Sequence, residues 1–461
     1  MSRVLLSFPS PIYLNGKFHS TCFYEGFINA LQEEGNELMV INTYSFLHQS
    51  IHNQQFKFPP YIDKEKMVAD VKRFNPELVI TFNHSIPLEV EEACNCPITI
   101  WDVDSFDFLC GKDHIGANLD KYIYIELGRA SSKKLIAFGA PAEKVHVVRS
   151  ATAIQAEKKP FLRNIAFIGN PFYGPQSMVG LLTEPRKDVF IEASKVFAKN
   201  FYTNIEDVLS AEDLKILAKY MHPAEFKGIS SGQNRITTLN DLSDLGLTVW
   251  GPSTWLSLAP YLPQLAMAYE KKPVFSLQHN QDVYNSSKIG ISISHAQAAD
   301  GYPWRVMDIM ASNGCMLSDY HSGIDDLTKG YVKLPMFHSH IEARELAAKI
   351  LKDEAWRQDL VAGSQACIEA TSRWHHRFKE LEHITGISLL AISKSKKTKP
   401  QPTPVIHIER KNYLASSYTI YYLLIKMAAR CLPSFIKGMI YKIMNKNGIY
   451  FDSHIIRSIR G

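Results

Sequence analysis

The sequence predicts an α/β protein made of two Rossmann-like halves, followed by a basic amphipathic helical tail. Three observations support this prediction. Apolar runs of strand length alternate with helical patterns, which is typical of parallel, doubly wound sheets. The alternation starts again after a polar connector near residue 155, and the composition becomes rich in lysine and proline after residue 387.

The first half, residues 1–155, is predicted to form one doubly wound sheet. No G-x-G-x-x-G sequence follows its first strand, so the sequence gives little support to a dinucleotide cofactor. The expected strands are residues 3–8, 37–42, 78–82, 98–101 and 122–125, and the expected helices are residues 20–34, 64–74 and 130–138.

The second half, residues 156–387, opens with the polar connector and a new strand at residues 164–168. Its last helical patterns come so late in the chain that they could pack back across the first half. The other expected strands are residues 247–250, residues 289–293 and a strand that ends at residue 319. The expected helices are residues 188–198, 205–220, 234–245, 341–351 and 354–383, together with a short helix before residue 313.

Length and composition suit two folded domains. The chain has 461 residues, of which 46% are apolar and 11% aromatic, so it can bury large cores. Its seven cysteines lack the paired spacing of a structural zinc site, which predicts core thiols in a reducing compartment and no bound metal. The amino terminus lacks an apolar signal core, and no apolar run is long enough to span a bilayer, so we expect a cytoplasmic protein.

The end of the chain is predicted to contain a linker, residues 388–404, and a basic amphipathic tail, residues 405–461. From residue 388 onward, thirteen Lys and Arg stand against two acidic residues, so this part carries +11 and the rest of the chain −6 of the net +5. Aromatic and aliphatic residues interleaved with lysines favour peripheral contact with the inner face of the cell membrane. The alternative is a pair of helices packed on the protein body. No nucleic-acid-binding module is visible, and no nucleic acid is expected.

The segment 284–319 has the pattern of a ligand site in an open α/β sheet. Ser294 and His295 follow a predicted strand, and Arg305 and Asp308 begin the next helix, so all four are expected where such sheets bind ligands. The Arg305 guanidinium suits a phosphate, although it could instead be a surface arginine paired with Asp308. His295 could contact a phosphate or transfer a proton, and the alternative is an ordinary loop residue.

The pattern VYNSSKIGISIS…DGYPWRVMDIMASNGCMLSD…GIDDL resembles the donor-binding half of the group 1 glycosyltransferases, especially the CgeB-like branch. The likeness is close over residues 283–327 and loose to about residue 381. It implies a GT-B architecture, in which two Rossmann-like domains face each other across a cleft. The second domain would hold the nucleotide-sugar and the first the acceptor.

The resemblance also implies roles for single residues. Arg305 would contact the donor diphosphate, Asp308 would take the place of the family's helix carboxylate near the donor sugar, and Gly314 would permit close packing. Two departures are visible. Asp308 is shorter than the usual glutamate, and the strand end with Ser294 and His295 replaces one that more commonly contains asparagine.

Asp102 and Asp104 end a strand of the first half in the sequence Trp101–Asp102–Val103–Asp104. This D-x-D spacing could hold a metal ion, but GT-B enzymes generally stabilise the leaving diphosphate with helix termini and basic side chains. Either aspartate could instead act as the base that takes a proton from the acceptor hydroxyl, and the CgeB-like branch has a similar strand end. Capping of the next helix is the structural alternative.

Two glycine turns end strands of the second half. Gly169 with Asn170, and Gly251 with Ser253, could present backbone amides or a hydroxyl to nucleotide or phosphate. Tight turns alone would explain them equally well.

The predicted function is transfer of a sugar from a nucleotide-sugar donor to a glycan or lipid-linked acceptor, in bacterial surface polysaccharide assembly. The donor would be a co-substrate, and no cofactor is expected. Three alternatives stay open: a CMP-sugar-acid transferase of Kdo type with the same architecture, a nucleotide-sugar epimerase, and a non-catalytic glycan-binding protein.

Overall fold

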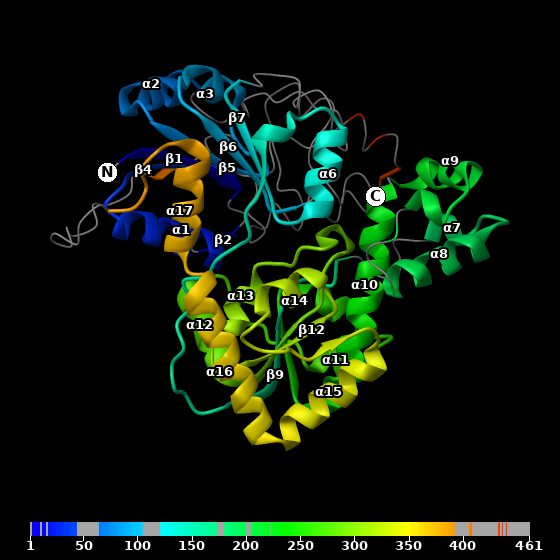
Figure 1. Cartoon of the computed structure of the whole chain (residues 1–461). Coiled ribbons are helices and arrows are strands. Elements are labelled where there is room, and N and C mark those ends of the chain that lie inside the picture. Colours follow the sequence, from blue (N-terminus) through cyan, green and yellow to red (C-terminus); the bar gives the residue numbers. More distant parts are fainter. Residues whose placement is uncertain are drawn as a thin grey trace.

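The computed structural model describes most of the two predicted halves. The described residues are 2–9, 12–14, 17–43, 64–104, 120–172, 179–199, 203, 205–221, 223–391, 405–407, 432–433, 436 and 439. They form two parallel sheets, one from each half, with helices packed around them (Figure 1). The predicted α/β class is therefore confirmed.

The first sheet has seven strands in the order β14-β4-β1-β5-β6-β7-β8, and all its pairings are parallel. Its strands are β1 (Arg3–Pro9), β4 (Glu37–Thr43), β5 (Leu78–Phe82), β6 (Ile98–Asp102), β7 (Tyr122–Glu126), β8 (Val145–Val147) and β14 (Val405–His407). The helices are α1 (Cys22–Glu33), α2 (Lys64–Phe74), α3 (Leu88–Ala93) and α6 (Arg129–Ala137), with a 3-10 turn η2 (Ala142–Lys144). A small antiparallel ribbon, β2 (Ile12–Leu14) with β3 (Lys17–His19), follows β1.

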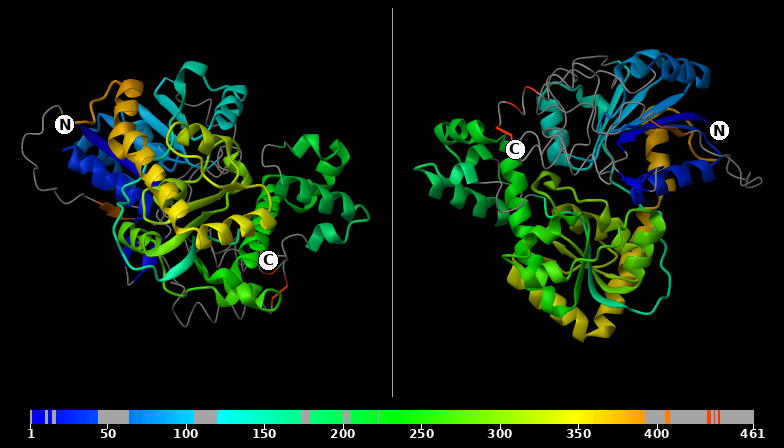
Figure 2. Two further views of the ribbon diagram at one scale, coloured as in Figure 1. Left: turned by 60° about the horizontal axis from the view of Figure 1, so that its bottom comes forward. Right: turned by 180° about the vertical axis from the view of Figure 1, so that it is seen from behind.

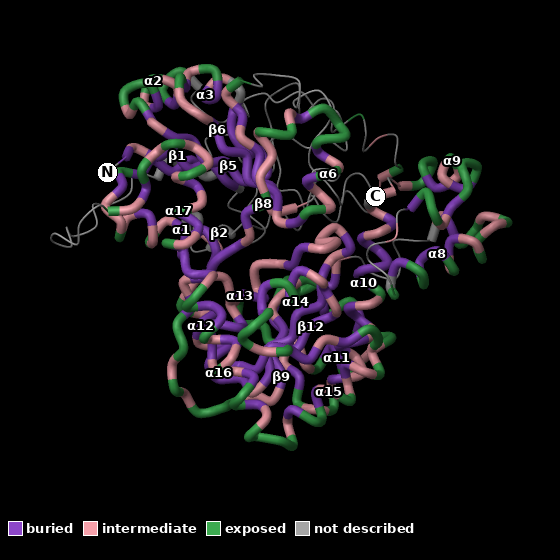
Figure 3. The backbone as a smooth tube through the Cα atoms, in the orientation of Figure 1, coloured by how far each residue is buried: buried purple, intermediate pink, exposed green. Residues whose placement is uncertain are grey.

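Strand β1 shows why this half folds as a covered sheet. Leu5 packs into one apolar cluster, whereas Val4, Leu6 and Phe8 pack into another on the opposite face. Both faces are buried (Figure 3), so the strand is an almost continuous apolar run rather than an alternating one.

The second sheet has five strands in the order β10-β9-β11-β12-β13, again all parallel. Its strands are β9 (Arg163–Ile168), β10 (Leu247–Trp250), β11 (Ser287–Ser292), β12 (Cys315–Asp319) and β13 (Met336–Phe337). Its helices are α10 (Pro223–Asp241), α11 (Pro263–Met267), α12 (Leu277–Asn285), α13 (Arg305–Met310), α14 (Ser322–Thr328), α15 (His340–Lys352) and α16 (Glu354–Thr371), with 3-10 turns η5 (Ser243–Leu245), η6 (Ser253–Leu258) and η7 (Ala296–Ala298).

A helical insertion separates β9 from β10. It contains α7 (Val179–Leu182), α8 (Lys187–Lys199), η4 (Ile205–Asp207) and α9 (Ala211–Tyr220), and it leads into α10. It projects from the side of the molecule (Figure 2) and has its own apolar cluster, which includes Phe190 and Phe226. The single helix predicted at residues 205–220 is wrong, because Ser210 caps a separate helix by accepting a hydrogen bond from the amide of Asp213 (3.1 Å).

The single helix predicted at residues 354–383 is also wrong, because the chain breaks between α16 and α17 (Trp374–Thr385). At the break, Arg373 forms an isolated bridge with Thr152 of the connector. Helix α17 then packs Trp374 and Phe378 into the core of the first half. The chain therefore returns to the first sheet near residue 373 (Figure 1).

The two halves meet at α1. Phe23 of α1 stacks on Trp304, the residue before α13. The amide of Cys22 donates to the carbonyl of Phe275 (2.7 Å), and Glu25 accepts from the amide of Leu277 (2.8 Å). These contacts hold α1 against both α12 and α13.

Only the start of the predicted tail belongs to an element that the structure describes. β14 pairs with β4 at the edge of the first sheet, with His407 beside Asn42. The predicted linker from residue 392 and most of residues 408–461 lie outside the described residues. Within the described part, no helix is both long and apolar enough to cross a membrane.

Replacing Trp374 with alanine should destabilise the first half, because this side chain is 4% exposed and packs edge-on against Phe23 and Phe27. We expect a loss of about 3–5 kcal/mol in the free energy of unfolding, measured by denaturant titration. Lys379→Ala, an exposed position on the same helix, is the control and should change stability little. Equal effects of the two variants would contradict the packing of α17 on this core.

Candidate active site

The loops after β9 and β10 run side by side at the carboxyl edge of the second sheet. A Cβ atom at Gly251 would lie 2.0 Å from the carbonyl oxygen of Gly169, so only glycine fits there. Trp255 Nε1 donates to the same oxygen (2.9 Å). Asn170 and Ser253 are exposed next to these glycines, so the four residues predicted from the two turns lie together.

Two arginines lie at this edge. The guanidinium carbons of Arg235 and Arg305 are 5.1 and 5.2 Å from the centroid of the Phe167 ring at the end of β9. Arg305 begins α13 as predicted, and its Nη2 would be 3.1 Å from a Cβ at Gly169. Arg235 comes from α10, is 2% exposed, and donates to the carbonyl oxygens of Asn170 (2.7 Å) and Ile293.

The arginine pair carries positive charge that its surroundings only partly balance. Among the described residues, the buried Nη1 of Arg305 and Nε of Arg235 have no hydrogen-bond partner. Burial, and then the neighbouring Arg305, hold the pKa of Arg235 well below its usual value. Burial also lowers the pKa of Arg305, against the opposing effects of Tyr284 and Asp319. An anion bound between the two guanidinium groups would relieve this cost.

Ser294 is fully buried and bonded to Asp319, the last residue of β12. Its amide donates to Asp319 Oδ2 (2.9 Å) and its hydroxyl donates to Oδ1 (3.2 Å). Burial alone would raise the pKa of Asp319, but His321 and Ser294 lower it, so the carboxylate is ionised. Ser294 therefore fixes the loop that follows β11.

His295 belongs to the same loop and lies near Arg235. Its Nδ1 accepts a hydrogen bond from the amide of Gln297 (3.1 Å), and its ring meets Phe172 edge-on. Burial, together with Arg235 and Lys227, lowers the pKa of His295 to about 3. The imidazole is therefore neutral near pH 7 and a weak base, which favours a role in loop geometry over proton transfer.

Asp308 lies at the junction of the two halves. Its Oδ1 accepts from Thr152 Oγ1 (2.6 Å) in the connector, and its Oδ2 lies 3.8 Å from Cys22 Sγ on α1. Burial raises the pKa of Asp308 to about 6, although Thr152, Cys22 and Arg305 lower it. Both oxygens are thus engaged by residues from outside the second sheet.

Gly314 does not lie with the other predicted site residues. It precedes β12, at the amino edge of the second sheet, whereas the ligand edge is formed by the carboxyl ends of the strands. A Cβ there would approach the carbonyl oxygen of Tyr284 to 2.9 Å. Its place in the fold is close packing of α12 against the start of β12.

The carboxyl edge of the first sheet carries a group of carboxylates. Asp102 ends β6, is 3% exposed, and pairs in register with Glu126 at the end of β7. The pKa of Asp102 is raised to about 8, chiefly by burial. The charge of Asp104 adds to this rise, and a hydrogen bond with Glu126 opposes it. The Asp102 carboxyl group is therefore largely protonated near neutral pH.

Asp104 is partly buried and faces the second half. Its Oδ2 accepts from Asn83 Nδ2 (2.9 Å), and its Oδ1 accepts from Gln297 Nε2 (2.5 Å) in the loop after β11. Burial raises the pKa of Asp104, and these two amide donors oppose the shift. A second link lies nearby, since Asp300 accepts from the amides of Arg129 (3.0 Å) and Ala130 (3.0 Å) at the start of α6.

Several residues of this arrangement carry no local signal in the sequence. Arg235 lies on a polar helix whose predicted start was one residue away, and only the fold shows that it points to Phe167. Asn83 and Glu126 follow or end strands, so a search for polar residues at every strand end would have found them. Gln297 is identified only by its contact across the two halves.

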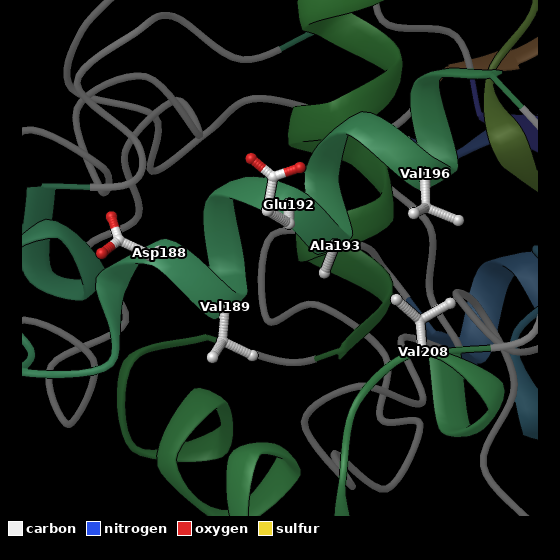
Figure 4. A pocket seen from close by; sticks show the side chains of 6 residues that line it. All are labelled: Asp188, Val189, Glu192, Ala193, Val196 and Val208. Carbon is white, nitrogen blue, oxygen red and sulfur yellow. The ribbon is translucent and has the colours of Figure 1, made fainter.

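A pocket on the helical insertion lies apart from these residues (Figure 4). None of the predicted site residues lines it. Its lining combines two carboxylates with small apolar side chains: Asp188, Val189, Glu192, Ala193, Val196 and Val208.

Two open parallel sheets, with an arginine-lined edge on the second, define an α/β protein suited to an anionic ligand. Residues 233–383 match the family model described as glycosyl transferase-like. The match runs from α10 to α17 and includes both arginines, Ser294, His295 and Asp308. It confirms the predicted class of enzyme, a glycosyltransferase, for this part of the chain.

Several solved structures are similar in overall arrangement. HepE from Anabaena in complex with UDP and glucose has 11% identity, covers 84% of this chain and 100% of its own, and has a TM-score of 0.44. A glycosyltransferase from Rickettsia africae has 12% identity over 86% of this chain and 99% of its own, with a TM-score of 0.44. Sucrose-phosphate synthase from Thermosynechococcus elongatus has 10% identity, covers 83% of this chain and 98% of its own, and has a TM-score of 0.48. These values are too low to transfer a function, and no curated protein sequence matches the chain.

The buried carboxyl pair makes stability depend on pH. Asp102 stays protonated in the folded protein up to about pH 8, whereas an unfolded chain loses this proton near about pH 4. Between these values the folded state binds more protons, so stability falls as pH rises, by at most about 1.4 kcal/mol per pH unit. Asp102→Asn cannot lose a proton and should remove this part of the fall.

Denaturant unfolding of both proteins between about pH 5 and pH 8 measures the effect. Asp120→Asn, at an exposed position, should follow the wild type at each pH. A stability difference between Asp102→Asn and wild type that stays constant with pH would contradict the raised pKa of Asp102.

Proposed function

We propose that this chain transfers a sugar from a nucleotide-sugar donor to a glycan or lipid-linked acceptor. The second half, residues 156–387 without α17, holds the donor, and the first half, residues 1–155 with α17, holds the acceptor. The likeness of residues 283–327 to the CgeB-like branch of group 1 glycosyltransferases supports this assignment of donor and acceptor binding to the two halves.

The single observation that carries the proposal is the pair formed by the buried Arg235 and the half-buried Arg305. Arg235 and Arg305 converge on Phe167, and each keeps a buried nitrogen without a hydrogen-bond partner among the described residues. Two such groups suit the two phosphates of a nucleoside diphosphate better than the single phosphate of a CMP-linked sugar acid. The amide of Gly169 already donates to the carbonyl of Trp250 (2.8 Å), so the amide of Gly251 and the exposed Ser253 and Asn170 would complete the donor site.

The facing carboxylates support a transferase mechanism. The acceptor hydroxyl oxygen forms a bond to the anomeric carbon while the bond from that carbon to the diphosphate oxygen breaks. The nucleoside diphosphate leaves with the bonding electrons, and Arg305 and Arg235 stabilise its charge. The hydroxyl proton goes to Asp104, because that aspartate is the less buried of the pair and faces the second half. Asp102 then influences the proton affinity of the neighbouring Asp104. Ser294, His295 and Asp308 hold the donor loops in place.

The biological setting is also part of the proposal. A basic tail that contacts the inner face of the cell membrane suits an acceptor on a lipid carrier, as in bacterial surface polysaccharide assembly. The enzyme would then work in the cytoplasm, at the membrane surface.

Arg305→Ala should weaken nucleotide binding about ten- to hundred-fold, because a charge-assisted hydrogen bond contributes about 1.5–3 kcal/mol. A thermal-shift titration with UDP, GDP, CMP and their sugars measures this loss. Arg73→Ala, which removes an exposed arginine on α2, is the control and should bind as the wild type does.

Release of nucleotide with and without acceptor then separates the remaining classes. Release that needs an acceptor supports the transferase. Turnover of the donor without acceptor would indicate an epimerase, and binding without release would indicate a non-catalytic protein. No stabilisation by any nucleotide would refute the donor site.

The membrane contact can be tested without disturbing the fold. A chain that ends after His407 keeps the strand that pairs with β4 and lacks only residues 408–461. We expect it to bind anionic lipid vesicles much more weakly than the full chain in a sedimentation assay, while nucleotide binding stays unchanged. Equal sedimentation of the two proteins would refute the contact.

A further inference from the structure

The side chain of Asn83 holds the turn that carries Asp104. Its Oδ1 accepts hydrogen bonds from the amides of Val103 (2.8 Å) and Asp104 (3.1 Å), and its Nδ2 donates to Asp104 Oδ2 (2.9 Å). One amide group therefore fixes both the backbone and the carboxylate of this residue.

The backbone at Asn83 is suited to this task. The residue follows β5 directly, is 1% exposed, and has φ of 50°, in the left-handed region that asparagine tolerates better than most residues. Its own amide donates to the carbonyl of Trp101 (2.9 Å), one strand over. The turn after β5 is thus tied to the end of β6 at four points.

We propose that Asn83 is the positioning residue for the catalytic base Asp104, an inference that rests on the proposed function. Asn83 anchors one carboxylate oxygen from within the first half, and Gln297 anchors the other from the second half. Held by these two donors, the carboxylate keeps one orientation and has further lone pairs for the acceptor hydroxyl. The base is complete only when the two halves face each other as they do here.

Loss of this orientation should lower the rate without weakening donor binding. A misplaced catalytic group costs about 100-fold in rate, because the reacting atoms no longer meet in the productive geometry. The proposed donor residues lie on the other sheet, and among the residues that the structure describes none of them is hydrogen-bonded to Asn83. The titratable groups that face Asp104 are Asp102 beside it, Glu126 beyond Asp102, and Tyr24 on α1.

Asn83→Asp tests the inference most directly. The variant keeps an oxygen for the two amides but replaces the N–H donor with a second carboxylate oxygen facing Asp104. We expect kcat to fall about 10- to 100-fold, with an unchanged KM for the donor. The acidic limb of the kcat profile should move to higher pH, because neighbouring carboxylates raise each other's pKa.

Asn83→Gly is the second variant. It accepts the left-handed backbone without strain and lacks the whole side chain, so it decides the question if Asn83→Asp does not fold. Its kcat should fall to a similar extent. The matched controls are Asn75→Asp and Asn75→Gly, because Asn75 has nearly the same φ of 49° but is exposed at the end of α2. Both controls should keep the wild-type kcat and pH profile.

Three outcomes would overturn the inference. If the folded Asn83 variants keep the wild-type kcat and pH profile, the positioning role of Asn83 is overturned and the assignment of Asp104 as the base is not. Full turnover by Asp104→Ala would overturn the assignment of the base and leave the glycosyltransferase function standing. Absence of sugar transfer by the wild-type chain with every donor would overturn both the inference and the proposed function.

Discussion

The contact between α1 and α13 joins the two halves of the protein and constrains their relative position. Phe23 stacks on Trp304, which immediately precedes Arg305, so the ring that joins the halves also sets where α13 begins. Asp308, one turn further on, is bonded to Thr152 in the connector. The position of Arg305 is therefore fixed by residues outside its own sheet. Any relative movement of the two halves at this point would move the guanidinium as well.

Charge is distributed unequally over the two facing edges. The second sheet presents the buried Arg235 and the half-buried Arg305, whose pKa values are lowered by desolvation, and the first sheet presents Asp102, Asp104 and Glu126. A departing anion and a proton that must be removed need opposite environments. The positive edge suits the former and the carboxylate edge the latter. Burial raises the cost of each charge, but it also strengthens each interaction with a ligand, because little water competes inside the site.

The sequence predicted the strands, the restart of the sheet, the strand-end positions of Asp102 and Ser294, and the position of Arg305 at the start of a helix, because apolar periodicity and chain direction are local properties. It failed where the outcome depended on distant partners. The break before α17 reflects the crossing of Arg373 to Thr152, and the role of Arg235 depends on Phe167, far away in the sequence. His295 was predicted as a candidate for phosphate contact or proton transfer, with an ordinary loop residue as the alternative. Its low pKa follows from burial that no sequence pattern reveals.

The pairing of β14 with β4 determines where the end of the chain emerges. Because the pairing is parallel, His407 lies beside Asn42, and the chain leaves the sheet at the edge that also carries Asp104. The residues after His407 are thereby joined to the chain at that edge. In kinetic terms, a binding event beyond His407 would give its ligand an effective concentration at this edge that depends on the length of the intervening chain.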